Sequence, residues 1–151
     1  VYRVGIHIAD AGALILPGSA LDQEADRRMA TLYLPERKVT MLPPEISTGP
    51  GSLVPGEKRV ALSLLARTNG SGDLLDWEVV PSVIRSQASL TYEEADRAMG
   101  DAEHPWGPVL ALLNRIADSL RQKREEAGAI TLEPPEMLIE VNASGESGGA
   151  N

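Results

Sequence analysis

The chain has 151 residues, a formal net charge of −8 and an apolar fraction of 42%, which together indicate one acidic globular domain. This acidity argues against a free-standing nucleic-acid-binding domain, because phosphate contacts need a surplus of Lys and Arg. There is no cysteine, which excludes disulfides and thiolate metal sites, and no apolar run approaches the roughly 20 residues of a membrane-spanning helix. We therefore expect a cytoplasmic protein that makes no contact with a membrane.

Residues 1–10 alternate between apolar and polar side chains, which predicts a half-buried strand. Tyr2, Val4, Ile6 and Ile8 share one face, and Arg3 and His7 lie on the other. The chain starts inside this strand, without an initiator methionine. Because an end strand needs a neighbour to pair with, we expect the sequence to be a piece of a longer protein that folds poorly alone.

A short helix is predicted over residues 20–30, with Ser19 as its N-cap and Asp22 in a capping-box-like position. The segment "TLYLP" leaves this helix in extended form, because Pro35 cannot continue it. Residues 38–59 are dense in proline and glycine, which predicts an ordered loop with short strand pieces.

The second half of the sequence mixes strands and helices, which favours an α+β fold with β-hairpins and a mixed sheet packed with helices. Strands are predicted over residues 60–68 and 74–90, joined by the turn "NGSGD". Thr91 and Glu94 form a capping box for the next helix, and a long helix follows over residues 108–128. Its apolar stripe comprises Val109, Leu112, Leu113, Ile116 and Leu120. A strand over residues 129–141 and a flexible tail or cut loop over residues 142–151 complete the prediction.

Few residues show a spacing that is typical of a catalytic, phosphate-binding or metal-binding site. His7 and His104 have no metal-ligand spacing, and Ser19 caps a helix and does not sit in a nucleophile elbow. The glycine-rich stretches lack the Lys-Ser/Thr pair of a phosphate-binding loop. Asp10 follows the first strand and is the one acid placed like a site residue, whereas the other carboxylates read as solvated helix faces.

Four segments in order resemble the catalytic (RNB) domain of the ribonuclease II family: "VGIHIAD", "PGSALDQEADRRMATLYLPERKVTMLPPEIS", "GSLVPGEKRVALS" and "PSVIRSQASLTYEEAD". The later "LRQKREEAGAITLEPPE" fits the helix and strand that follow in that family. The resemblance runs from Val1 to about Glu140. It implies that residues 1–151 are the central part of such a domain, incomplete at both ends.

The resemblance implies a monomeric hydrolytic exoribonuclease that threads single-stranded RNA, 3′ end first, and releases 5′-monophosphate nucleotides with the help of Mg²⁺. The family's metal-binding aspartates lie in a "D…D-x-D-D" motif, which is expected upstream of Val1. A glutamate and an arginine of the family's site are expected beyond Asn151. No catalytic residue and no metal ligand is therefore expected within this sequence.

The resemblance also implies that three residues bind RNA. Tyr33 matches a family tyrosine near the scissile end that helps to set the length of the final product. Tyr92 matches a tyrosine that stacks on terminal bases, and a stacked base contributes about 1–3 kcal/mol. Leu132 stands where the family commonly has an aromatic residue, so a looser grip on the last nucleotide is expected. Ser89 replaces an arginine found in many relatives.

Two other functions remain open at this point. A non-catalytic RNB-like protein would bind RNA or a partner without cutting. An acidic interaction module unrelated to RNA would show no protection of Tyr33 or Tyr92 by single-stranded RNA and no salt-dependent binding.

Overall fold

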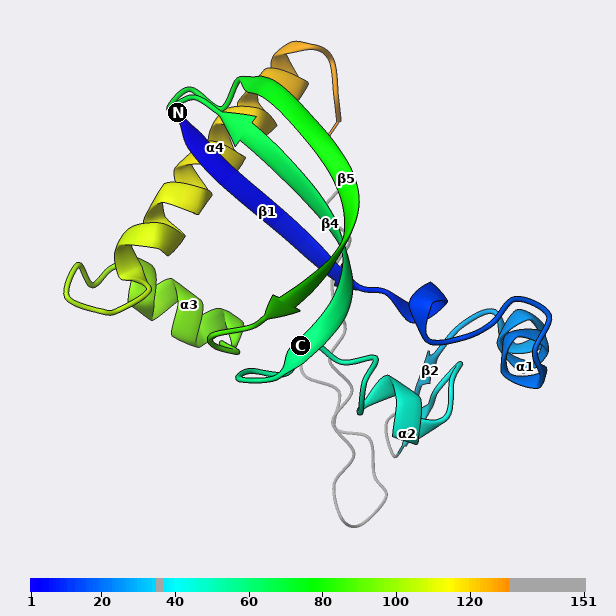
Figure 1. The fold of residues 1–151 in the computed structure, drawn as a ribbon. Coiled ribbons are helices and arrows are strands. Elements are labelled where there is room, and N and C mark those ends of the chain that lie inside the picture. Colours follow the sequence, from blue (N-terminus) through cyan, green and yellow to red (C-terminus); the bar gives the residue numbers. More distant parts are fainter. Residues whose placement is uncertain (35–36, 131–151) are drawn as a thin grey trace, which may run out of the picture. The chain divides into compact units, whose positions relative to one another are not determined.

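The structure is a computed structural model that describes residues 1–34 and 37–130. The described residues form two compact units, one made of residues 1–10 and 53–130 and the other of residues 11–34 and 37–52 (Figure 1). Each contains strands and helices, and the α+β fold is confirmed. The predicted strand over residues 129–141 lies almost wholly outside the described residues, and the predicted tail over residues 142–151 lies entirely outside them.

The first unit contains a three-stranded antiparallel sheet in the order β1-β4-β5. The strands are β1 (Tyr2–Ala9), β4 (Lys58–Thr68) and β5 (Leu74–Arg85). β4 and β5 are long and strongly curved, and they form the hairpin predicted around "NGSGD" (Figure 1). β5 ends at Arg85, before the predicted end at residue 90, and the following residues lead into a helix.

The register places apolar residues from all three strands next to one another on one face of the sheet. Ile6 lies opposite Leu64, which in turn lies opposite Val79. The alternation predicted for the first strand is therefore confirmed, but its burial is not. Ile6 is 58% exposed and Ile8 is 59% exposed. Within the described residues nothing covers this part of the face, because alternation determines which side chains share a face and not what packs on it.

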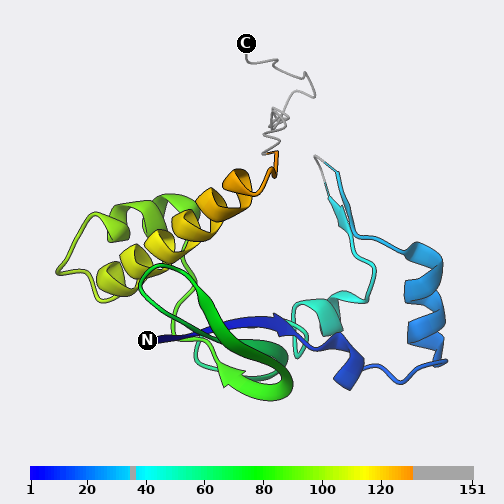
Figure 2. The ribbon, with the colours of Figure 1, turned by 90° about the horizontal axis from the view of Figure 1, so that it is seen from above.

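Two helices lie on one side of this sheet, α3 (Tyr92–Met99) and α4 (Gly107–Glu126) (Figures 1 and 2). They contribute Ala98 and Ile116 to the small buried core of the described residues. Ile116 is the most buried member of the predicted apolar stripe. Gly128, at the predicted stop of the long helix, has a φ of +94°, a left-handed conformation that glycine adopts at low cost.

The C-terminal half of α4 is attached to the β4–β5 turn. The Ser119 hydroxyl donates a hydrogen bond to the carbonyl oxygen of Ser71 at 2.6 Å, and Lys123 Nζ donates to the same oxygen at 2.9 Å. Lys123 also forms an ion pair with Asp73. The hydrogen bond from Lys123 holds the pKa of the Asp73 carboxyl below its ordinary value. A helix and a turn far apart in sequence are thus connected by polar contacts.

The capping box predicted for α3 is present in full. Glu94 N donates to Thr91 Oγ1 at 3.2 Å, and Thr91 N donates to the Glu94 carboxylate at 2.8 Å. The second contact and the Thr91 hydroxyl lower the pKa of Glu94 below its ordinary 4.5. Two amide donors at the start of the helix therefore have partners within the motif.

Because the pKa of Glu94 is lowered in the folded protein, its contribution to stability is present above about pH 4.5 and is lost as the pH falls through the folded value. We expect the Glu94→Gln variant to lose less stability than the native protein on acidification below pH 4.5. The free energy of unfolding, measured by urea titration at a series of pH values, checks this. Glu93→Gln, on the same helical turn but outside the capping box, is the matched control; equal pH dependence in both variants would contradict the expectation.

The second unit consists of short elements. They are the 3₁₀ turn η1 (Ala11–Ala13), helix α1 (Ala20–Arg28), strands β2 (Leu32–Tyr33) and β3 (Lys38–Val39), and helix α2 (Pro44–Ser47). β2 and β3 pair in an antiparallel hairpin. The predicted loop over residues 38–59 thus contains one strand, one helical turn and the start of β4.

Helix α1 begins where the sequence predicts and ends slightly earlier. Asp22 N donates to Ser19 Oγ at 3.3 Å, whereas the Asp22 carboxylate accepts from Gly18 N at 2.7 Å, one residue before the cap. The helix ends at Arg28, two residues before the predicted end, because Met29 adopts a left-handed conformation with a φ of 60°. This turn directs the chain into β2.

Candidate functional site

Tyr33 lies on β2, in the hairpin that β2 forms with β3. It is paired directly with Lys38, and Leu34 N donates to the Arg37 carbonyl at 2.9 Å to close the hairpin. The tyrosine side chain is 76% exposed. The Lys38 ammonium lies 4.9 Å from the centroid of its ring, within the range of a cation–π interaction. The hairpin therefore exposes an aromatic ring and a positive charge next to each other.

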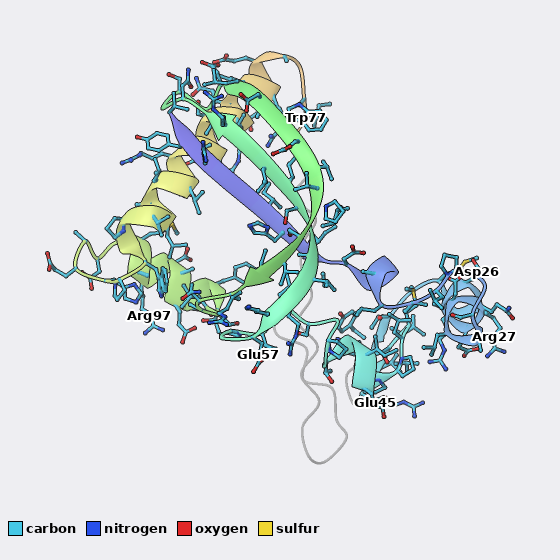
Figure 3. All side chains as sticks on the ribbon, in the orientation of Figure 1. Asp26, Arg27, Glu45, Glu57, Trp77 and Arg97 are labelled. Atoms are coloured by element: carbon cyan, nitrogen blue, oxygen red, sulfur yellow. The ribbon has the colours of Figure 1, made fainter. Side chains whose placement is uncertain are left out.

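The base of this hairpin is fastened to α1. Arg28 Nη1 donates to the Thr40 carbonyl at 3.0 Å, while Arg28 Nε donates to Glu24 at 2.7 Å. Met41 N donates to Thr31 Oγ1 at 3.1 Å. The Arg28 hydrogen bond, with a further one from Arg27, lowers the pKa of the Glu24 carboxyl. Asp26 and Arg27 project from the same helix in Figure 3. These contacts hold the two strands, and with them Tyr33, in a defined orientation relative to α1.

Tyr92 is the first residue of α3 and is 90% exposed. The capping box formed by Thr91 and Glu94 fixes the backbone on either side of it. The backbone that carries the ring is therefore fixed, and the ring itself packs little against the described residues. This exposure excludes a core role for Tyr92 within the described residues and leaves both ring faces accessible.

The three predicted RNA-binding residues fall in different parts of the chain. Tyr33 belongs to one unit and Tyr92 to the other, and Leu132 lies outside the described residues. Their common role in binding remains a prediction. Each of the two tyrosines is, by itself, exposed on a locally braced element.

A row of polar side chains crosses the three-stranded sheet, and the sequence reasoning did not identify it. His7 Nδ1 lies 2.6 Å from Ser63 Oγ, which lies 2.5 Å from Ser82 Oγ. The Ser82 hydroxyl also bonds to the Ala61 carbonyl at 3.1 Å. A Cβ added to Gly5 would come within 2.5 Å of His7 Nε2, so glycine leaves room for the imidazole ring. His7 is exposed, and its hydrogen bond connects it to the buried Ser63.

The same face of the sheet is hollowed near the β4–β5 turn. A concavity of about 730 Å³ is lined by residues of all three strands, including Arg3, Arg67, Asp76, Trp77 and Glu78. Arg67 Nη1 forms an ion pair with Asp76 at 2.7 Å, and Trp77, 60% exposed, projects from β5 (Figure 3). The two arginines are balanced by two carboxylates, so the lining has no strong preference for one sign of ligand charge.

Residues 1–34 and 37–130 contain no group of three or more His, Asp or Glu side chains placed to hold a metal ion. Asp10 follows β1, and its backbone N–H donates to the Val60 carbonyl at 3.2 Å. The His, Asp and Glu side chains of the described residues therefore do not form a site that fits a divalent cation. In the same part of the chain, no helix has the length and apolar character needed to span a membrane.

Comparison with known proteins gives the family. The model of the RNB domain matches residues 1–149. The chain belongs to the RNB family. It is related to the exoribonucleases of the ribonuclease II and R type, and the resemblance drawn from the sequence is confirmed.

The RNB relatives include proteins named as nucleases and one named as an inactive exonuclease. An uncharacterized ribonuclease from Synechocystis is 39% identical over 145 residues, covering 96% of this chain and 22% of the relative. DIS3-like exonuclease 2 and inactive exonuclease DIS3L2 of Arabidopsis thaliana are each 39% identical over 148 residues, covering 87% of this chain and 14% of each relative. The chain thus spans between 14% and 22% of the length of these relatives.

A solved RNB structure has the same fold. The RNase R of Mycoplasma genitalium, solved in complex with ribose-methylated single-stranded RNA, superposes with a TM-score of 0.86 at 22% identity. The match covers 96% of this chain and 23% of that protein. This similarity supports the assigned fold, with strands and helices arranged as in a ribonuclease R domain.

Proposed function

We propose that this RNB chain is part of a 3′-to-5′ exoribonuclease that degrades single-stranded RNA hydrolytically to 5′-monophosphate nucleotides. Membership of the family over residues 1–149 is the observation that carries the proposal. The relative solved with single-stranded RNA adds support for the class of substrate.

Within that activity we assign RNA gripping to Tyr33 and Tyr92. Both rings are exposed, and each stands on an element whose backbone is fixed by hydrogen bonds. An aromatic face stacks on any base, so such a grip is independent of sequence, as an enzyme that degrades RNA of any sequence requires. Leu132 would complete the set as an aliphatic contact.

The Mg²⁺ that the family resemblance implies is not assigned to these residues. The described acids do not gather into a metal site, so its ligands would come from other residues. The role proposed for residues 1–34 and 37–130 is therefore to bind and orient RNA.

A second candidate is an RNB-like protein that binds RNA without cutting it. The observation behind this alternative is that the chain is as similar to the inactive exonuclease DIS3L2 as to DIS3-like exonuclease 2, at 39% identity to each. Both candidates use the same exposed tyrosines, so RNA binding alone does not separate them.

A time course with the protein in its full natural length and 5′-labelled single-stranded RNA, with Mg²⁺ and with chelator, separates the two. We expect fragments that shorten from the 3′ end to a short limit product, and complete loss of shortening in chelator. Binding without shortening in Mg²⁺ would favour the non-catalytic candidate. Absence of binding would contradict both.

A further inference from the structure

Lys38 is the residue that accompanies Tyr33 on the β2–β3 hairpin, and the family assignment gives it no role. We propose that Lys38 binds the phosphate of the nucleotide whose base stacks on Tyr33, so that the pair grips one nucleotide by base and backbone together. This inference rests on the RNA-gripping role proposed for Tyr33.

The position of Lys38 follows from backbone pairing. Tyr33 and Lys38 are directly opposite residues of the antiparallel hairpin, so their side chains leave the same face. The hairpin itself is held by Arg28 and Thr31. The register therefore places the lysine beside the ring, and the ammonium lies 4.9 Å from the ring centroid.

The Lys38 ammonium covers part of one face of the Tyr33 ring, so the other face is available for stacking on a base. The ring remains 76% exposed with Lys38 beside it, which is ample area for stacking. A cation over one face and a base on the other can coexist, since each uses a different side of the π-system.

The ammonium is also available to a phosphate. It has three donors, and contact with a ring face leaves donors that can point toward an anion. No ion pair of Lys38 is found among residues 1–34 and 37–130, whereas Lys123 pairs with Asp73 and Arg28 with Glu24. A lysine contacts phosphate as a point charge, so this contact would not depend on base identity. In a chain with a net charge of −8, a local positive charge such as the Lys38 ammonium would attract the negatively charged RNA backbone.

The test measures binding of a fluorescent single-stranded RNA oligonucleotide to the full natural-length protein in excess chelator, over a range of salt concentrations. For Lys38→Met we expect about five-fold weaker binding at about 50 mM salt and a log–log salt slope smaller by about 0.7, the loss of one phosphate contact. Lys38→Arg should keep the slope. Lys58→Met, which removes an exposed lysine from β4, is the matched control and should leave affinity and slope unchanged.

The double variant Tyr33→Ala/Lys38→Met shows whether the two residues act on one nucleotide. We expect Lys38→Met to cost less in the Tyr33→Ala background, because the nucleotide is no longer held there. An unchanged salt slope in Lys38→Met, or costs that simply add, would overturn the inference while leaving Tyr33 its role. No effect of Tyr33→Ala on binding would instead contradict the proposed gripping by Tyr33.

Discussion

Replacing Gly107 by alanine is expected to destabilise the protein by about 3 kcal/mol, among the largest effects of any single methyl group in the described chain. Gly107 is buried at the first turn of α4, where the loop from α3 returns. A Cβ there would collide with the Asp101 carbonyl oxygen and come within 2.6 Å of the Ala98 carbonyl oxygen. Both obstacles are backbone atoms, which cannot rotate away, so the α3–α4 connection would have to shift.

Urea unfolding followed by tryptophan fluorescence measures this effect, because Trp106 is adjacent to the substituted residue. Gly70→Ala is the matched control: it makes the same chemical change in the β4–β5 turn, where an added Cβ meets no atom within 4 Å. We expect Gly70→Ala to leave the free energy of unfolding nearly unchanged. Equal unfolding midpoints for the two variants would show that the α3–α4 loop yields easily and would refute the steric explanation.

The features that the sequence predicted well are local ones. The cap at Ser19 and the capping box of Thr91 and Glu94 each depend on side chains within four residues of the helix start. The alternation in residues 1–10 likewise predicted which side chains share a sheet face. The exposed positions of Tyr33 and Tyr92 leave both side chains accessible for the RNA-binding roles that the family resemblance implied, and those roles stay predictions.

The features that the sequence did not predict depend on contacts between distant residues. The row of His7, Ser63 and Ser82 exists only because antiparallel pairing brings three strands into one register, and no local pattern gives that register. The pairing of Tyr33 with Lys38 needs the geometry of the hairpin turn. Burial of the apolar sheet face was overestimated for the same reason: what covers a face is not encoded in its alternation.

Tyr92→Ala is expected to weaken binding of single-stranded RNA by about 5- to 160-fold, which corresponds to the 1–3 kcal/mol of one base stacked on an aromatic ring. The ring is 90% exposed, so its removal should cost almost no folding stability. The loss of affinity would then reflect a lost contact with RNA and not partial unfolding. Equilibrium binding in chelator, with unfolding measured in parallel, provides both numbers.

Tyr92→Phe separates stacking from hydrogen bonding, because phenylalanine keeps the ring and loses only the hydroxyl. We expect it to bind as the native protein does, with the same salt dependence, since stacking involves no charge. Loss of affinity in Tyr92→Phe equal to that in Tyr92→Ala would assign the contact to the hydroxyl. Native affinity in Tyr92→Ala would remove Tyr92 from the RNA-binding surface and leave gripping in the described chain to the hairpin that carries Tyr33 and Lys38.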